Sequence, residues 1–170
     1  MAHKMEAFVG KSQHVLARLD GGAAWRLKDL PHGFVLIPRC ELLRQSGWTA
    51  ETPAVADFEL FDHLDVDEVA WAVALSTGGL LAYIETDYFG GWGTQAALVW
   101  QDGRVLLGPL THSDDNPAQK RTPLASLPIN TALRALGVVR AADKHDEFDT
   151  LGLGEFRDLS LETYWTELGM

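Results

Sequence analysis

The chain has 170 residues, 46% of them hydrophobic, and its 24 acidic and 14 basic residues give a formal net charge of −10. This length predicts one domain over residues 1–170 with room for a proper core. The acidic balance, without any cluster of Lys or Arg, argues against a nucleic-acid-binding protein. It fits either a protein kept soluble by its charge or one whose partner is basic.

The cytoplasm is the expected compartment. The single cysteine, Cys40, cannot form a disulfide within the chain, so a reducing environment is expected. No apolar run reaches membrane-spanning length, and the polar N-terminus lacks the pattern of a signal peptide. We therefore expect no membrane association.

The first half of the chain predicts short elements whose place on a sheet stays open. Ser12 to Leu19 has the pattern of a short helix, and Phe34 to Ile37 that of a buried strand. A helical turn is expected at Glu41 to Gln45, where Cys40 packs as a small hydrophobe. The spacing of apolar residues from Phe58 to Leu64 is closer to that of a helix than to that of a strand.

The best-marked helix lies between Asp65 and the glycine pair Gly78-Gly79. Asp65 is a suitable N-cap residue, and Glu68 three residues later completes a capping box. Val69 to Leu75 supplies the apolar surface, and the glycines end the helix.

Residues 80–110 indicate a three-stranded antiparallel meander, around which the fold is organised. Leu80 to Phe89 is rich in β-forming residues, and Gly90 to Gly93 interrupts it. The apolar run from Gln95 to Gln101 ends at Asp102-Gly103, a dipeptide typical of hairpin turns. With the flanking helices, this predicts an α+β fold with helices packed on an antiparallel sheet.

The register of the meander bears on a possible site. If Gly90 to Gly93 is a four-residue loop, Glu85 lies opposite Leu98. Glu85 then shares a face of the sheet with four residues: Tyr83, Asp87, Trp100 and Leu107. A carboxyl group among such neighbours has a raised pKa unless it is paired or hydrogen-bonded. The alternative is that Glu85 and Asp87 lie on a solvated margin of that face.

After the meander the sequence predicts a long loop and then short elements. The loop covers Thr111 to Leu127, and a helix follows at Pro128 to Leu136. Val138-Val139 has the pattern of a short strand, and Leu161 to Leu168 that of a helix with Ser160 as its N-cap.

Several local patterns suggest chemistry, but each has a simpler explanation. The glycines of residues 90–93 lack the spacing of a phosphate-binding loop. Capping accounts for the acids of residues 63–68, and a solvated loop accounts for those of residues 145–149. No zinc-binding pattern is present, and Cys40 has no histidine near it in sequence. We expect no metal site, no cofactor and no catalytic cysteine.

Four segments resemble, in order, those of a family of small uncharacterised bacterial cytoplasmic proteins: AYIETDYFGGWGTQAALVW, DGRVLLGPL, PINTALRALGV and DEFDTLGLGEFR. They lie within residues 80–157, about half of the chain. The family has no established chemistry, so the resemblance implies no catalytic role. In size, acidity and architecture the chain also resembles immunity proteins that neutralise bacterial toxins.

The order of these segments suggests that distant polar residues meet. The hypothesis is one network made of Glu85, Asp87, Gln95, Asp146 and Arg157, formed where the last segment folds back onto the Gly90 to Gln95 loop.

Three functional hypotheses follow. The first is a non-enzymatic acidic binding protein, such as an immunity or inhibitor protein, that meets a basic protein through the acidic segments 51–68 and 143–162. Its expected binding residues are Tyr88, Trp92, Gln95, Asp146, Glu147 and Arg157. The second is a small enzyme or ligand-binding protein that uses Glu85 and Asp87 in a pocket beside the Gly90 to Gln95 loop. The third is a homo-oligomer joined through exposed aromatic residues.

Overall fold

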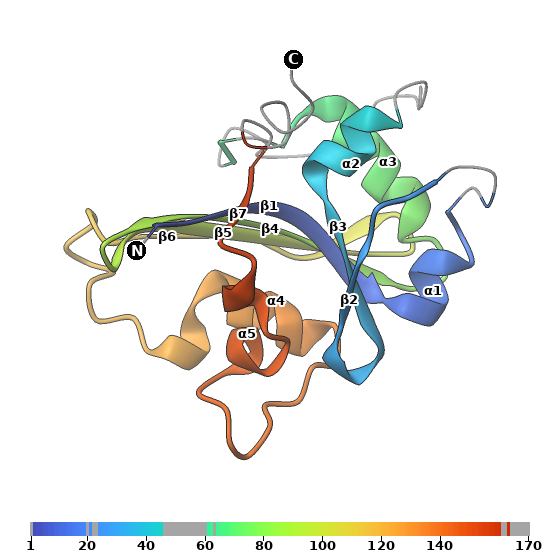
Figure 1. Cartoon of the computed structure of the whole chain (residues 1–170). Helices are drawn as coiled ribbons and strands as arrows, with labels where there is room; N and C mark the ends of the chain where they lie inside the picture. Colours follow the sequence, from blue (N-terminus) through green and yellow to red (C-terminus); the bar gives the residue numbers. More distant parts are fainter. Residues whose placement is uncertain are drawn as a thin grey trace.

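The computed structural model describes residues 2–19, 21, 24–45, 61–62, 64–160 and 163. One sheet organises the molecule, with strand order β2-β3-β1-β4-β5-β6 (Figure 1). Neighbours in this order run antiparallel, and β7 pairs in parallel with the start of β1. The strands are β1 (Ala2–Lys11), β2 (Lys28–Leu30), β3 (Phe34–Pro38), β4 (Leu80–Phe89), β5 (Trp92–Gln101), β6 (Arg104–Ser113) and β7 (Asp158–Leu159).

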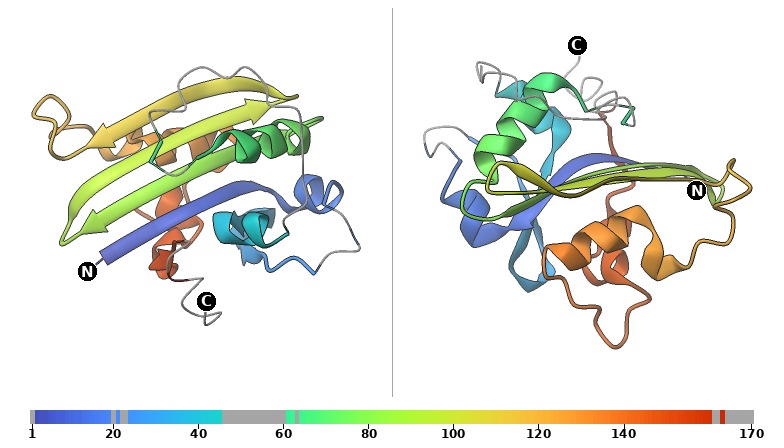
Figure 2. Two further views of the ribbon diagram at one scale, coloured as in Figure 1. Left: turned by 90° about the horizontal axis from the view of Figure 1, so that it is seen from above. Right: turned by 180° about the vertical axis from the view of Figure 1, so that it is seen from behind.

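Helices pack on both faces of this sheet, which confirms the predicted α+β class (Figures 1 and 2). One layer is formed by α2 (Arg39–Arg44) and α3 (Val66–Leu75). The short helix α1 (Ser12–Leu16) lies at the end of the sheet, where its Val15 joins the same core as α3. The opposite layer is formed by α4 (Pro128–Ala135) and α5 (Glu147–Thr150). Short 3-10 turns also occur: η1 (Pro31–Gly33), η3 (Leu124–Ser126) and η4 (Leu153–Glu155).

The sheet therefore separates two apolar cores. On the α3 side, the core joins Trp71 and Leu75 of the helix to Phe8, Tyr83 and Trp100 of the sheet. On the α4 side, the core holds Met5, Ala7, Ile84, Val99, Ile129 and Leu133. Successive side chains of a strand point to opposite faces, so each central strand feeds both cores.

The predicted meander is present as β4, β5 and β6, but its first turn is shorter than expected. Only Gly90 and Gly91 form the turn, with φ of 63° and 82°, and Phe89 already pairs with Trp92. Two adjacent glycines supply both positive φ angles that a two-residue hairpin needs. Glu85 therefore lies opposite Ala96 instead of Leu98. Because the shift is two residues, Glu85 keeps the face that it was predicted to share with Trp100 of β5.

The second turn forms at Asp102-Gly103 as predicted, but irregular pairing follows it. Register shifts between Ala97 and Trp100 place Leu107 opposite Val99. Leu107 consequently packs against the core on the α4 side, so the prediction that it shares a face with Glu85 is wrong. Each extra residue in one strand turns the following side chains to the other face.

The sequence did not reveal β1, although this strand lies between β3 and β4 in the sheet. Residues 5–10 of β1 are buried, with Met5 in one core and Phe8 in the other. Glu6 interrupts this apolar run, and its carboxylate is held in a buried polar cluster described below.

The predicted capping box opens α3. The Asp65 carboxylate accepts from the backbone N–H groups of Asp67 and Glu68, and Glu68 in turn accepts from that of Asp65. The strand β3 and the helix α4 also form where expected. Val138-Val139 is not a strand, and β6 extends into the start of the predicted 111–127 loop.

Two sequence predictions lie largely or wholly outside the described residues. The helical spacing of Phe58 to Leu64 falls in a range of which only residues 61, 62 and 64 are described. Of the helix expected at Leu161 to Leu168, residue 163 alone is described.

Candidate functional site

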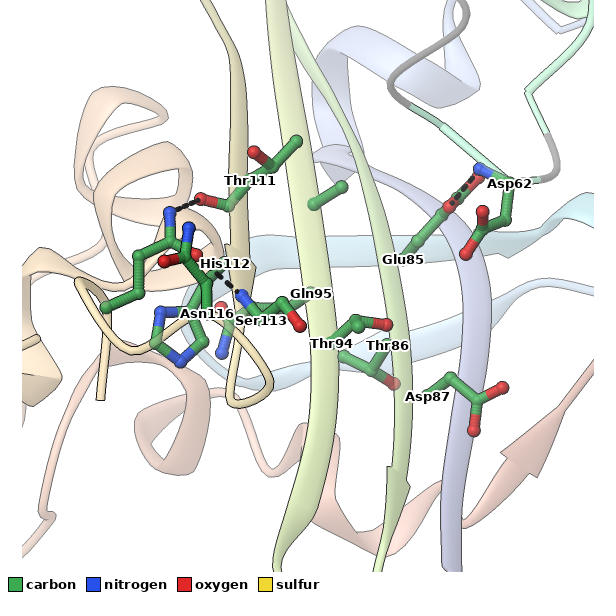
Figure 3. Close-up of a pocket in the computed structure, with 12 residues that line it drawn as sticks. Asp62, Glu85, Thr86, Asp87, Thr94, Gln95, Thr111, His112, Ser113 and Asn116 are labelled. Atoms are coloured by element: carbon green, nitrogen blue, oxygen red, sulfur yellow. Dashed lines mark hydrogen bonds between the residues drawn. The ribbon is translucent and has the colours of Figure 1, made fainter.

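A polar pocket of about 310 Å³ lies on the sheet across β4, β5 and β6 (Figure 3). We call it the sheet pocket. Its floor and walls include Asp62, Glu85, Asp87, Thr94, Thr111 and Ser113, and Asn116 and Gln119 join from the loop after β6. Among the described residues that line it there is no Lys or Arg.

The pocket forms where the apolar core of the α3 side ends. Along β4, Tyr83 lies in that core, whereas Glu85 and Asp87, two and four residues further on, lie in the pocket. Cross-strand pairing extends the change across the sheet: Thr94 lies opposite Asp87, and Thr111 opposite Ala96. The alternation of the strands thus places acidic and hydroxyl groups in adjacent rows on one face.

The two carboxylates that the sequence singled out differ in environment. Glu85 is 7% exposed, and its oxygens accept from the Tyr83 hydroxyl at 2.8 Å and from the backbone N–H of Asp62 at 3.1 Å. Burial, followed by the charge of Glu85, raises the pKa of Tyr83, so this hydroxyl remains a donor. Asp87 is exposed. One carboxylate is therefore fixed and the other is accessible.

Behind the pocket lies a buried acid cluster, which we define as Glu6, Arg39 and Glu68. Glu6 lies opposite Glu85 in the sheet, so the cluster borders the pocket directly. Arg39 Nε lies 2.5 Å from Glu68 Oε1, and Arg39 Nη1 lies 3.1 Å from Glu6 Oε2. One guanidinium thus holds two carboxylates that are 2% and 1% exposed.

Sequence reasoning missed Glu6 and Arg39, and it explained Glu68 by capping alone. One feature of the sequence could have indicated these residues, namely a charged residue directly beside a strongly apolar run. Glu6 precedes Ala7 to Val9, and Arg39 follows Phe34 to Pro38. Buried charges are normally paired, so two such residues of opposite sign are candidates for one ion pair.

Glu68 makes the stability of the fold depend on pH. Burial raises its pKa from 4.5 to about 7, although the Asp65 backbone N–H and the charge of Arg39 oppose the shift. Because the folded state binds this proton more tightly than the unfolded state, the stabilisation is complete below the unfolded pKa and is lost as pH rises through the folded one. Between about pH 5 and 8 we expect the free energy of unfolding to fall by on the order of 3 kcal/mol.

Urea unfolding at a series of pH values tests this expectation. Glu68→Gln, which mimics the protonated side chain, should remove most of the slope. Asp67→Asn, a change at an exposed acid of the same helical turn, should leave the slope intact. A wild-type profile without a slope in this range would contradict the prediction.

The hypothetical five-residue network is divided between the two faces of the sheet. Glu85 and Asp87 line the sheet pocket. Tyr88, Gln95 and Asp146 line a second pocket on the α4 side, and Gln95 lines the sheet pocket as well. Gln95 bonds to Tyr88 and Ile129, and Asp146 bonds to Asn130 and Asp149. Arg157 is exposed and lines neither pocket, while its backbone carbonyl accepts from the Lys4 N–H. Strand alternation, which sends neighbouring side chains to opposite faces, explains the division.

The other two predicted binding residues lie apart from each other. Trp92 is 49% exposed at the start of β5, where its Nε1–H donates to Asp115 and Lys120 lies over its ring at 5.2 Å from the centroid. Glu147 is buried and its carboxylate pairs with Arg134 at 3.0 Å. Glu147 is therefore a structural residue in α5, whereas Trp92 is available to a partner.

Cys40 is a buried free thiol. Burial raises the pKa of the Cys40 thiol to about 11, which keeps it protonated and weakly nucleophilic. Among the described residues, no three His, Cys, Asp or Glu side chains are grouped as a metal site would require. Within the same residues, no helix has the length and apolar character needed to cross a membrane.

Comparisons of the chain with family models, with curated proteins and with solved structures found no match.

Proposed function

We propose that this chain is an acidic, non-enzymatic binding protein and that its sheet pocket receives a basic side chain of a partner protein. The observation that carries the proposal is the composition of the pocket. Asp62, Glu85 and Asp87 line it, hydroxyl and amide groups surround them, and its described lining contains no Lys or Arg. Such a pocket complements a Lys or Arg side chain in charge and in hydrogen bonding.

Exposed aromatic residues next to the pocket support a protein partner. Phe89 and Trp92 face each other across the β4–β5 turn and are 78% and 49% exposed. Asp87 and Thr94, which line the pocket, lie two positions away on the same strands. Exposed aromatic anchors beside a charged recess are typical of binding hot spots.

The net charge of −10 adds long-range attraction to a basic partner and raises the association rate. The biological form of this proposal is an immunity or inhibitor protein that neutralises a basic toxin or another basic protein in the cytoplasm. Such a protein needs a preformed acidic surface and no catalytic group.

The same pocket supports a second candidate, because Glu85 and Asp87 lie in it together. A small enzyme or ligand-binding protein would use these carboxylates on a small molecule, with one protonated and the other ionised. The fixed position of Glu85 and the exposure of Asp87 provide the different environments that such a pair requires.

Affinity capture from a lysate of the source organism, followed by binding kinetics with the purified partner, separates these candidates. We expect a basic protein whose binding weakens with salt. Trp92→Ala should weaken it by about thirtyfold, as for a hot-spot residue. Asp87→Asn should mainly slow association and reduce the salt dependence. Asp29→Asn, a change at an exposed acid of β2 that lines neither pocket and lies outside both acidic segments, is the matched control.

Two results would overturn the proposal. One is a captured partner that Trp92→Ala and Asp87→Asn bind as well as wild type does. The other is capture of no basic protein, together with a small molecule that co-purifies with wild type and is lost in Glu85→Gln. The second result would establish the alternative function. Circular dichroism of each variant verifies that it is folded.

A further inference from the structure

The second pocket lies on the face of the sheet opposite the sheet pocket and has a volume of about 290 Å³. We call it the α4 pocket. Its walls are mainly apolar and include Leu124, Leu127, Ile129 and Phe148. Small-molecule sites are typically apolar pockets of about 300–1,000 Å³ with a few convergent polar groups, so this pocket suits a ligand of one or two rings.

The polar groups of the α4 pocket have defined donor and acceptor roles. The backbone N–H of Ile129 donates to Gln95 Oε1 at 3.1 Å, which orients the amide so that its Nε2 donates to the Tyr88 hydroxyl at 3.1 Å. Tyr88 oxygen is therefore the acceptor in this bond. Among the described residues, no acceptor takes the proton of that hydroxyl, so Tyr88 has a donor left for a ligand.

His3 contributes no charge and no spare donor. Its Nε2 lies 3.3 Å from the carbonyl of Leu153, which can only accept, and its Nδ1 lies 2.8 Å from Thr86 Oγ1. The Leu153 carbonyl places a proton on Nε2, and in the neutral tautomer Nδ1 accepts from the Thr86 hydroxyl. Burial lowers the pKa of His3 in agreement with this form.

Asp146 supplies the acceptor of the pocket. Its Oδ2 takes one hydrogen bond from Asn130 Nδ2, and its Oδ1 takes one from the backbone N–H of Asp149. Each carboxylate oxygen has a second lone pair, so Asp146 can accept again. The described lining holds no Lys or Arg, and an anionic ligand would meet an uncompensated carboxylate.

We propose that the α4 pocket binds a small aromatic molecule that carries a neutral group with both an acceptor and a donor, such as a carboxamide. The ring packs among Leu124, Leu127 and Phe148. The acceptor takes the hydrogen bond of the Tyr88 hydroxyl, and the N–H donates to Asp146. Gln95 and Thr86 line both pockets, but the groups proposed to contact the ligand line the α4 pocket alone: Tyr88, Leu124, Leu127, Asp146 and Phe148.

Titration of the isotope-labelled full chain with benzamide, followed by NMR, tests the proposal. We expect chemical-shift changes concentrated at the residues of the α4 pocket. Benzoate, which has the same ring with a negative group, should bind at least tenfold more weakly. Tyr88→Phe should weaken benzamide binding by about five- to tenfold, the usual effect of one lost neutral hydrogen bond.

A matched pair of leucines controls for general effects. Leu124→Glu places a charge at the 48% exposed wall of the pocket and should abolish benzamide binding, whereas Leu106→Glu, at a 52% exposed leucine of β6 outside the pocket, should not. Benzamide shifts that are absent or scattered over the chain would overturn the proposal. Equal binding of benzoate, or wild-type affinity in both Tyr88→Phe and Leu124→Glu, would also overturn it. None of these outcomes depends on Asp87 or Trp92, so the partner proposal is tested separately.

Discussion

Replacing Arg39 with methionine should lower the free energy of unfolding by about 3–5 kcal/mol near pH 8. Arg39 is the one described cation that contacts both Glu6 and Glu68, and all three side chains are at most 10% exposed. Removing the guanidinium takes away the counter-charge that Arg39 supplies to two buried carboxylates. Removing one partner of a buried ion pair lowers the free energy of unfolding by much more than the intact pair adds to it, because the remaining charge stays buried away from water.

The pH dependence identifies this mechanism. The deficit of Arg39→Met should shrink towards about pH 5, where Glu68 is protonated in both proteins and the variant has less uncompensated charge. Urea unfolding at the two pH values measures the difference. Arg140→Met, a change at an exposed arginine that donates to the Lys144 carbonyl, should cost no more than about 0.5 kcal/mol.

A second set of variants separates lost charge from lost packing. Combining Arg39→Met with Glu6→Gln and Glu68→Gln should recover part of the lost stability, because no buried charge of the cluster then remains. No recovery, together with a deficit that is independent of pH, would mean that Arg39 acts through its packing alone.

Asn130→Ala should destabilise the fold by about 2–4 kcal/mol, the second large effect that we expect. Asn130 is 3% exposed and joins three segments of the chain. Its Nδ2 donates to the Leu124 carbonyl and to Asp146 Oδ2, and its Oδ1 accepts from the Phe148 N–H, each at 3.0 Å. Alanine leaves the Phe148 donor without a partner in a partly buried position, and this penalty dominates the loss.

Thermal unfolding together with hydrogen exchange measures this effect. The Phe148 amide should exchange faster in Asn130→Ala than in wild type. The exchange rates of the β3 amides should change only by the amount that the loss of global stability predicts. Asn116→Ala, a change at an exposed asparagine whose side-chain oxygen accepts from the nearby Ala118 N–H, is the control and should remain close to wild type. Equal stability of the two variants would show that Asn130 does not hold α5 against α4.

Predictions from sequence succeeded where a local rule decides the structure. Asp65 and Glu68 formed their capping box, because capping depends on residues three apart. Asp102-Gly103 formed its turn, since a glycine there is free to take positive φ. The local sequence did not determine the length of the first turn. All four residues from Gly90 to Gly93 are compatible with a loop, although only Gly90 and Gly91 form the turn.

Predictions failed where distant residues determine each other. The strand β1 was hidden because Glu6 breaks its apolar run, and the ion pair with Arg39 of α2 stabilises a buried glutamate there. Of the five residues expected in one polar network, Gln95 and Asp146 line the α4 pocket, which the sequence did not predict. Its separation from Glu85 and Asp87 required the register, which the sequence alone did not determine.

Successive side chains of β4 point to opposite faces of the sheet. Glu85 and Asp87 line the sheet pocket alone, Tyr88 lines the α4 pocket alone, and Thr86 lines both. Substitution of Glu85, Asp87 or Tyr88 therefore alters one pocket at a time. Insertion or deletion of a single residue before Glu85 would exchange the two sets of side chains and destroy both pockets at once. The segment therefore tolerates redesign by substitution but does not tolerate a change in its length.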